Sequence, residues 1–237
     1  MAQIPMAESR HIFSSIPRKH KKQKAINKGT YERSRICQVY QLDMSDPVIQ
    51  NIPRAGVVFY TFINNELHIC FGRDRRTGEL TDFGGGKKRN ENPIKCAIRE
   101  GNEESRCAFS KITVNQIQGF YCLYSSKMLI IFIPTASPNN IDVRCISNEN
   151  FTNCLLLNNK QKNDRRYNEI SEIVWLNENQ LNNLFSPRPS VQLFAKVRRF
   201  IYSCSNLSQD INLLKQILKS VVNDNSQFYK FNVIKIL

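Results

Sequence analysis

The sequence predicts an α+β fold, built from a sheet of β-strands, one central helix and further helices toward the C-terminus. The β-branched and aromatic run Ala55–Ile63 predicts one strand, and the alternating segment Glu66–Phe71 predicts a second. Asn64-Asn65 between them is typical of a hairpin turn. Because the strands surround a single helix and the other helices come later, this class is favoured over a doubly wound sheet.

The other elements follow from the same kinds of pattern. Asn92-Pro93 opens the central helix, because Asn caps a helix N-terminus and Pro is tolerated at the first helical position. The helical pattern runs to about Cys107. Further strands are predicted at Gly119–Tyr124, Met128–Pro134 and Glu172–Leu176, and further helices at Glu178–Phe185, Val191–Ser203 and Asp210–Val222.

The composition is that of a globular protein. Hydrophobic residues make up 41% of the 237 residues. The longest apolar run, Met128–Ile133, is far shorter than the roughly 18 residues that span a bilayer. The N-terminus lacks the apolar region of a secretory signal, so we expect an intracellular, cytoplasmic protein with no membrane partner. The eight cysteines form no CxxC pair, and reduced thiols are expected.

The chain is strongly basic, with a formal net charge of +14 and a pI near 9.6. Residues 1–36 contain nine Lys and Arg against Glu8 and Glu32, a net charge of +7 and half of the excess. We interpret this segment as a mobile basic arm. The charge favours a polyanionic partner such as RNA, a nucleotide or an acidic lipid headgroup. A solvated tail and a nuclear-targeting signal are the alternatives for the arm.

Three carboxylates share one face of the predicted central helix. Glu100, Glu103 and Glu104 stand at positions i, i+3 and i+4, where neighbouring Cβ atoms are roughly 5–6 Å apart. The apolar stripe of the same helix consists of Ile94, Ala97 and Ile98. We therefore expect the acidic face to lie outside the core.

The surroundings of these carboxylates favour phosphoryl chemistry. Clustered carboxylates suit Mg²⁺ or Mn²⁺, which also keep positions for water and phosphate. The glycines before the helix are expected to form a loop that lets backbone amides approach phosphate oxygens, and basic residues follow them. The alternative is a solvated acidic face after an ordinary turn. The predicted phosphate-binding residues are Gly84, Gly85, Gly86, Lys87, Lys88 and Arg73.

The spacing of these residues resembles the Nudix box. From Gly85 the chain has the pattern G-x5-E-x7-R-E-x2-E-E, with Glu91 and Arg99 at two of the specified positions. The usual form is Gly-x5-Glu-x7-Arg-Glu-U-x-Glu-Glu-x-Gly-U, where U is a bulky apolar residue. The flanking segments 71–73 and 82–83 are also similar to the strand and loop of the family.

This resemblance implies a mixed β-sheet sandwiched by helices and a hydrolase of phosphoanhydrides that depends on Mg²⁺ or Mn²⁺. Glu100 and Glu104 would be the principal metal ligands. Glu103 would be a further ligand or the catalytic base that takes a proton from water. Glu91 and Arg99 would join the loop to the helix as an ion pair.

Three positions depart from the family pattern. Gly101 occupies an apolar position in mid-helix, at a cost of about 1 kcal/mol relative to Ala. Arg106 replaces the glycine that ends the helix, and Cys107 stands where Ile or Val is usual. We expect these changes to loosen packing and to alter the C-terminus of the helix without removing a ligand.

The sequence also predicts a division into three parts. The basic arm covers residues 1–36, a hydrolase domain covers 37–185 with the box at 85–107, and a helical extension covers 186–237. In some members of the family a glutamate near a late strand reaches the metal. Glu169 is the first candidate for that catalytic role, and Glu172 is the second. A basic loop (Lys160, Lys162, Arg165, Arg166) and three arginines before the box (Arg73, Arg75, Arg76) are candidates to line the phosphate path.

Three functions remain open on the sequence. The first is hydrolysis of the 5′ cap of mRNA to methylated GDP and 5′-monophosphate RNA, by resemblance to decapping Nudix hydrolases of large DNA viruses. The basic arm and the net charge favour it. The second is hydrolysis of dinucleoside polyphosphates or diphosphoinositol polyphosphates, since the triple glycine followed by Lys resembles that branch. The third is a non-catalytic Nudix-fold module that binds RNA.

Overall fold

The computed structural model describes residues 38–42, 49–109, 111–135, 148–156, 164–184, 192–193, 197 and 211–224. The predicted basic arm and the candidates Lys160 and Lys162 lie outside these ranges, as does most of the predicted helix Val191–Ser203. Within the described ranges, no helix combines the length and the apolar character needed to cross a membrane.

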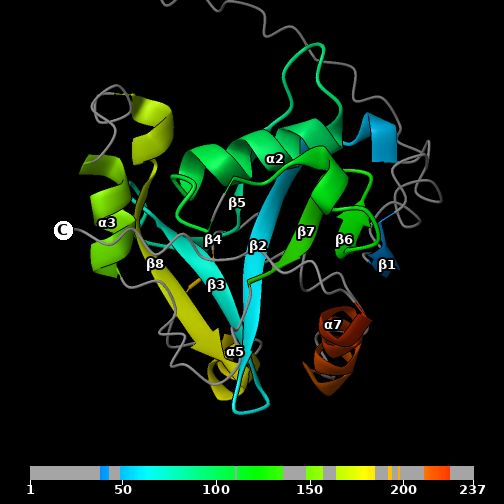
Figure 1. Cartoon of the computed structure of the whole chain (residues 1–237). Helices are drawn as coiled ribbons and strands as arrows, with labels where there is room; N and C mark the ends of the chain where they lie inside the picture. Colours follow the sequence, from blue (N-terminus) through cyan, green and yellow to red (C-terminus); the bar gives the residue numbers. More distant parts are fainter. Residues whose placement is uncertain are drawn as a thin grey trace, which may run out of the picture.

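A mixed β-sheet forms the centre of the molecule (Figure 1). Its path runs β1-β6-β7-β2-β3-β4, with β5 paired to β2 and β8 paired to β3. Strand β2 runs parallel to β7, and the other pairs are antiparallel. The strands are β1 Gln38–Gln41, β2 Arg54–Ile63, β3 Glu66–Asp74, β4 Leu80–Thr81, β5 Phe83–Gly86, β6 Tyr121–Ser125, β7 Met128–Pro134 and β8 Ile170–Asn177.

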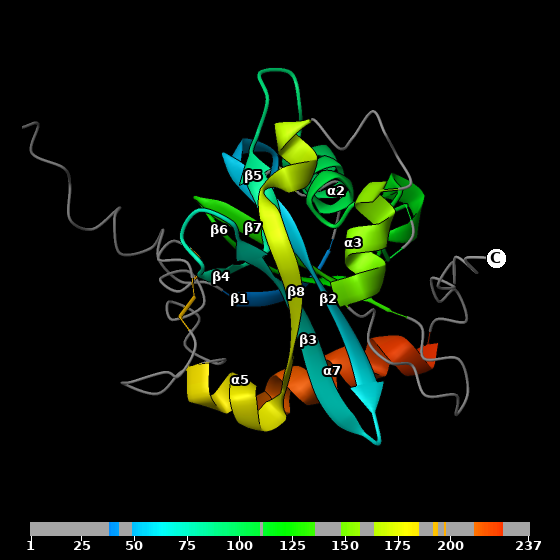
Figure 2. The ribbon, with the colours of Figure 1, turned by 90° about the vertical axis from the view of Figure 1, so that its left-hand side faces the viewer.

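Helices cover both faces of this sheet (Figure 2). Helices α2 and α3 pack on one face, and α5 and α7 pack on the other. The α-helices are α2 Pro93–Glu104, α3 Asn148–Leu156, α5 Glu178–Leu184 and α7 Ile211–Asp224. The 3-10 helices are η1 Ile49–Asn51, η2 Val114–Gln116 and η3 Arg165–Asn168. The expected α+β class, a mixed sheet between helices, is confirmed.

Strand β2 separates two hydrophobic cores. Val57 and Phe59 face the core beneath α2, whereas Val58 and Tyr60 face the core beneath α5 and α7. Successive side chains of a strand point to opposite faces, so a strand covered on both sides needs apolar residues at every position. This double burial explains the unbroken apolar run of β2 in the sequence.

The predicted hairpin is present, with a two-residue turn. Asn64 and Asn65 both have positive φ, +50° and +65°. A two-residue hairpin turn with two left-handed residues matches the twist of the strands, and Asn tolerates that conformation. Strand β7 begins and ends at the predicted residues, Met128 and Pro134.

Helix α7 belongs to the second core. Leu214 and Leu218 are buried against the sheet, and the Tyr60 hydroxyl donates a 3.3 Å hydrogen bond to the Leu218 carbonyl. Lys215 forms a 2.7 Å ion pair with Glu178 of α5. Part of the segment predicted as an extension therefore completes the core of the sheet, while the proposed boundaries at 36 and 185 remain a prediction.

Candidate active site

Helix α2 begins as the sequence predicts. The Asn92 side chain accepts a 2.7 Å hydrogen bond from the Lys95 amide, and Pro93 is the first helical residue. The predicted apolar stripe of Ile94, Ala97 and Ile98 is buried against the sheet. The helix ends at Glu104, earlier than the expected Cys107.

Gly101 brings α2 close to strand β2. A Cβ atom on Gly101 would lie 2.8 Å from Val57 Cγ2 and 3.1 Å from Ile112 Cδ1. Real side chains do not approach so closely, so a larger residue would push the helix away from the sheet. The expectation that Gly101 loosens the packing is therefore wrong, because this glycine permits a closer contact.

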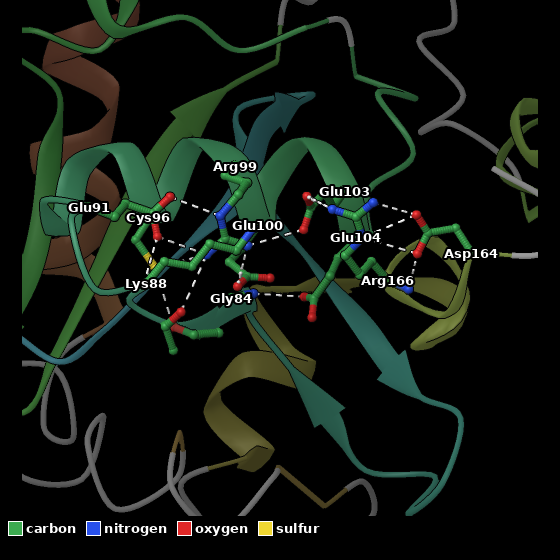
Figure 3. A network of polar contacts seen from close by, with 12 residues as sticks. Gly84, Lys88, Glu91, Cys96, Arg99, Glu100, Glu103, Glu104, Asp164 and Arg166 are labelled. Carbon is green, nitrogen blue, oxygen red and sulfur yellow. Dashed lines mark hydrogen bonds and ion pairs between the residues drawn. The ribbon is translucent and has the colours of Figure 1, made fainter. Parts of the chain in front are cut away.

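Arg99 binds several carboxylates at once (Figure 3). It forms a two-bond ion pair with Glu91, at 2.8 Å from Nε and 2.9 Å from Nη2. Its Nη1 donates to Glu100 at 2.6 Å and to Glu103 at 3.1 Å. Hydrogen bonding to Arg99 lowers the pKa of Glu91 below its ordinary value. The ion pair expected from the resemblance is thus present, and it extends to two of the three helix glutamates.

Glu104 is buried with little positive charge around it. Its side chain accepts a 2.7 Å hydrogen bond from the Gly84 amide, and the residue is 5% exposed. Burial raises its pKa well above the ordinary value, and the negative charges of Asp82 and Glu100 raise it further. The ionised form of Glu104 is therefore strongly disfavoured by its surroundings.

Glu100 lies in a similar field. Burial is the main cause that raises its pKa, the contact with Arg99 opposes this, and the charges of Glu103 and Glu169 add to it. A Cβ atom on Gly85 would lie 2.5 Å from Glu100 Oε1, so the absence of a side chain on β5 makes room for this carboxylate. Negative charge thus accumulates where α2 faces β5.

Glu103 is held by two arginines. Besides Arg99, the Nη1 atom of Arg166 donates to it at 3.3 Å from helix η3 (Figure 3). Arg166 is in turn bound to Asp164 at 2.5 Å. Glu103 is 8% exposed, and with Glu104 it contradicts the expectation that the acidic face lies outside the core. The reason is that β5 and η3 contact this face of α2.

The structure also corrects the expected glycine-rich loop. Gly84, Gly85 and Gly86 belong to strand β5, which pairs with β2. The amide of Gly84 binds Glu104, that of Lys87 binds the Pro53 carbonyl, and that of Lys88 binds Glu91. These three amides are therefore engaged within the protein, and Gly84 and Gly85 allow close approach of the Asp82 and Glu100 carboxylates. The phosphate contacts predicted for the glycines stay a prediction.

The other predicted residues divide into two groups. Glu169 is exposed and close enough to Glu100 for its charge to raise the pKa of that carboxyl. Glu172 instead forms an ion pair with Arg73 of β3 across the sheet. Arg73 also donates to the Gly78 carbonyl at 2.8 Å, so both residues are engaged away from α2.

Two features of the site do not follow from the sequence pattern. Asp82 is fully buried and accepts two hydrogen bonds from Arg54, at 2.8 Å and 2.7 Å. Arg106 is buried at the end of α2 and reaches the start of β8. The signal for Arg106 was its departure from the family pattern, whereas no local pattern relates Arg54 to Asp82.

The carboxylates fit a divalent cation in their chemistry. They are oxygen ligands, and burial, with neighbouring negative charges adding to it, raises the pKa of both Glu100 and Glu104. However, no group of three or more His, Cys, Asp or Glu in the described ranges has the arrangement of a metal site. Glu100 and Glu103 face Arg99, and Glu104 faces the Gly84 amide. The predicted three-glutamate site is therefore not preformed.

No protein-family model matches the sequence, and no curated protein matches it. Solved structures that are similar to this chain include Nudix hydrolases. A Caenorhabditis elegans Ap4A hydrolase is 13% identical, with 64% of this chain and 93% of that chain covered and a TM-score of 0.36. The Bacillus subtilis pyrophosphohydrolase BsRppH is 14% identical, with 82% and 93% covered and a TM-score of 0.36.

Proposed function

We propose that this chain is a Mg²⁺- or Mn²⁺-dependent hydrolase of the Nudix type that cleaves a phosphoanhydride. The observation behind the proposal is the acidic face of α2, where Arg99 binds Glu100 and Glu103 and the Gly84 amide binds Glu104. The box pattern from Gly85 to Glu104 supports it independently. Buried like charges are costly, and a bound divalent cation would remove that cost.

The roles follow from the contacts of each side chain. Glu100 and Glu104 would hold the cation, which would polarise the phosphate and lower the pKa of a coordinated water. Glu103 serves as a further ligand or accepts a proton from the attacking water. The Arg99 guanidinium fixes α2 to β5, since it binds Glu91 and also donates to the Gly86 carbonyl at 3.3 Å.

Phosphate contacts are proposed for exposed side chains near these carboxylates. Lys88, Arg89 and Arg166 are exposed. Arg166 is attached to Glu103 and can exchange that contact for a substrate phosphate. Lys87 is less available, because its Nζ donates to the Gln50 carbonyl at 3.3 Å.

The substrate we propose is the 5′ cap of mRNA, with methylated GDP and 5′-monophosphate RNA as products. The support is the net charge of +14, half of it in residues 1–36, because a long polyanion can contact the arm and the site together. Incubation with Mg²⁺ and cap-labelled RNA, free cap dinucleotide, dinucleoside polyphosphate or diphosphoinositol phosphate tests this directly. Release of methylated GDP from RNA supports decapping, and preferential hydrolysis of a small molecule contradicts it.

Catalysis is tested with Glu103→Gln, with Glu149→Gln in α3 as the matched control. Glu149 is an exposed glutamate on another helix. Glu103→Gln should lower turnover by orders of magnitude, because the carboxylate no longer binds the cation or accepts a proton. Activity should also disappear in EDTA and return with Mg²⁺ or Mn²⁺. Full turnover by Glu103→Gln, or full activity in EDTA, would show that the proposed chemistry is wrong.

The contribution of the basic arm is tested by deleting residues 1–36. Each phosphate neutralised on a single strand contributes a salt slope of about −0.7 to binding. Deletion should raise KM for long capped RNA and flatten its salt dependence, with little change in kcat. The free cap dinucleotide is the control, since it is too short to contact both regions. Equal salt slopes for the two forms would remove the argument for an RNA substrate.

A purely RNA-binding role is less well supported. Such a module gains nothing from carboxylates buried beside one another, and their negative charge repels a phosphate backbone. In the same assays, RNA binding without hydrolysis of any substrate would be the result expected for that role.

A further inference from the structure

The two residues Arg106 and Cys107, just after helix α2, have a backbone conformation that is unusual for residues other than glycine. Arg106 and Cys107 both have positive φ, +56° and +53°. Glycine adopts this region without strain and commonly follows the end of a helix, whereas a residue with a Cβ is disfavoured there. Arg106 is nevertheless 4% exposed, so the strained backbone directs a long cationic side chain into the protein.

That side chain joins three segments. The Arg106 guanidinium donates to the carbonyls of Tyr167 at 3.0 Å, Phe151 at 3.2 Å and Ile170 at 2.6 Å. Its Cζ atom also lies 3.9 Å from the centroid of the Phe151 ring. One residue at the end of α2 therefore contacts α3, η3 and the first residue of β8.

The contacts of Arg106 are neutral, which makes its burial costly. Within the described part of the chain, its hydrogen-bond partners are carbonyl oxygens, and the facing ring is aromatic. Burial lowers the pKa of Arg106 to about 10, and the charge of Arg75 contributes in the same direction. A buried cation without a carboxylate partner opposes folding, so its contacts are expected to serve another purpose.

The segment that Arg106 holds includes Glu169. Tyr167 and Ile170 lie on either side of Asn168 and Glu169, and both of their carbonyls bind Arg106. From the other side, Arg75 donates to the Asn168 carbonyl and, through its amide, to the Glu169 carbonyl, both at 2.9 Å. The same segment contacts α2 through Arg166, which donates to Glu103 at 3.3 Å, and the charge of Glu169 acts on Glu100.

We infer that Arg106 is a positioning residue, which sets Glu169 and helix η3 against the carboxylates of α2. The inference rests on the proposed function, because it gives Glu169 a part in the same site. Arg106 itself does not touch those carboxylates, so it acts through the backbone between Tyr167 and Ile170. The residue that departs from the family pattern thus connects the end of the box with the candidate glutamate outside it.

Arg106→Met and Arg106→Lys test the inference, with Asn102→Ala as the matched control. Asn102 joins the same part of α2 to a different segment, through hydrogen bonds to the Ile112 carbonyl at 3.0 Å and from the Ile112 amide at 2.8 Å. Hydrogen exchange, which needs neither metal nor substrate, is measured at amides 165–170. Exchange there should become faster in Arg106→Met, less so in Arg106→Lys, and should not change in Asn102→Ala. Unchanged exchange in both Arg106 variants would overturn the inference.

A double-mutant cycle then separates positioning from stability. We expect Glu169→Gln and Arg106→Met each to lower kcat on capped RNA by about tenfold to a hundredfold, since small misplacements have effects of this size. The double variant should lose little more than either single variant, because both changes disable the same group. Mn²⁺ titration by electron paramagnetic resonance should show weaker binding in all three. Multiplicative losses in kcat, or losses in Asn102→Ala equal to those in Arg106→Met, would show a merely structural role.

Failure of the proposed hydrolase function can be distinguished from failure of the inference about Arg106. If the full chain neither binds Mn²⁺ nor hydrolyses any of the substrates, the proposed function is wrong whatever the Arg106 variants do. Faster exchange confined to residues 165–170 would then still support the role of Arg106 in holding this segment. If exchange at residues 165–170 is unchanged in both Arg106 variants while the full chain binds Mn²⁺ and is active, the inference is rejected and the proposed function stands.

Discussion

Asp82, which precedes strand β5, and Glu104, which ends helix α2, are two buried carboxylates with opposite surroundings. Asp82 is 0% exposed and receives two hydrogen bonds from Arg54 and one from the Thr81 hydroxyl at 3.2 Å. Glu104 is 5% exposed and receives a 2.7 Å hydrogen bond from the Gly84 amide, while nearby charges of Asp82 and Glu100 repel it. The first carboxylate is compensated within the protein. The second has a charge that a bound cation would balance.

The partners of a buried carboxylate indicate whether it serves the fold or the function. A buried carboxylate with a complete set of partners contributes to the fold, whereas one that lacks compensation opposes folding and is expected to act in function. The two lie close enough for their charges to interact, so a structural ion pair stands beside a candidate catalytic group. Substitutions at the two positions should therefore have opposite effects on stability.

Asp82→Asn should give the largest effect on stability. It leaves the Arg54 guanidinium, whose side chain is 15% exposed, without its carboxylate partner. Loss of one member of a buried ion pair lowers the free energy of unfolding by about 3–5 kcal/mol. Chemical denaturation measures the change. Glu172→Gln is the control, because its ion pair with Arg73 is partly exposed and should contribute less than about 1 kcal/mol after solvent screening. Equal losses in the two variants would contradict the structural role of Asp82.

Gly84→Ala should have the second-largest effect on stability, because it disturbs both Asp82 and Glu104. A Cβ atom at this position would lie 2.5 Å from Asp82 Oδ2 and 2.6 Å from Gly56 Cα. Forcing an extra carbon into such a contact costs about 1–3 kcal/mol. Gly86→Ala is the matched control in the same strand, since its Cβ would have no neighbour within 4 Å. Thermal unfolding of both variants measures the difference, and similar melting temperatures would show that the close approach is unimportant.

Glu104→Gln should give the smallest change in stability, with the opposite sign. Removing an uncompensated buried charge while keeping the shape should raise the free energy of unfolding by about 1 kcal/mol in EDTA. Turnover should fall by orders of magnitude, because a proposed metal ligand is lost. A stabilised but inactive variant would confirm the comparison between the two carboxylates. A variant that is destabilised as strongly as Asp82→Asn would remove it.

The elements predicted correctly from the sequence depend on local chemistry. The turn at Asn64-Asn65 follows from the tolerance of Asn for positive φ, and the start of α2 follows from an Asn cap before Pro93. The ion pair between Glu91 and Arg99 followed from the spacing of a known motif. Each of these features involves residues close together in the sequence or a pattern already known to join them.

The features that were missed depend on contacts between distant segments. The burial of Glu103 and Glu104 requires β5 and η3 to cover α2, which no helical periodicity reports. Triple glycine was predicted as a loop, but its pairing with β2 makes it a strand. Gly101 and Arg106 were expected to weaken the helix, yet their partners come from β2, α3, η3 and β8. Helix α3 was not predicted, because it has only a weak apolar face.

Helix α7 is the last of the described elements to be synthesised, although it contributes Leu214 and Leu218 to the second core. Chain growth from the N-terminus supplies every described residue of the carboxylate site once Ile170 has been made, and helix α2 with its own core can then pack against the sheet. The opposite face of the sheet, which α5 covers earlier, stays incompletely covered near Tyr60 until Leu214 and Leu218 leave the ribosome. A nascent chain thus passes through a period in which the site is assembled on a sheet with one incompletely covered face, and that face is where a chaperone would bind.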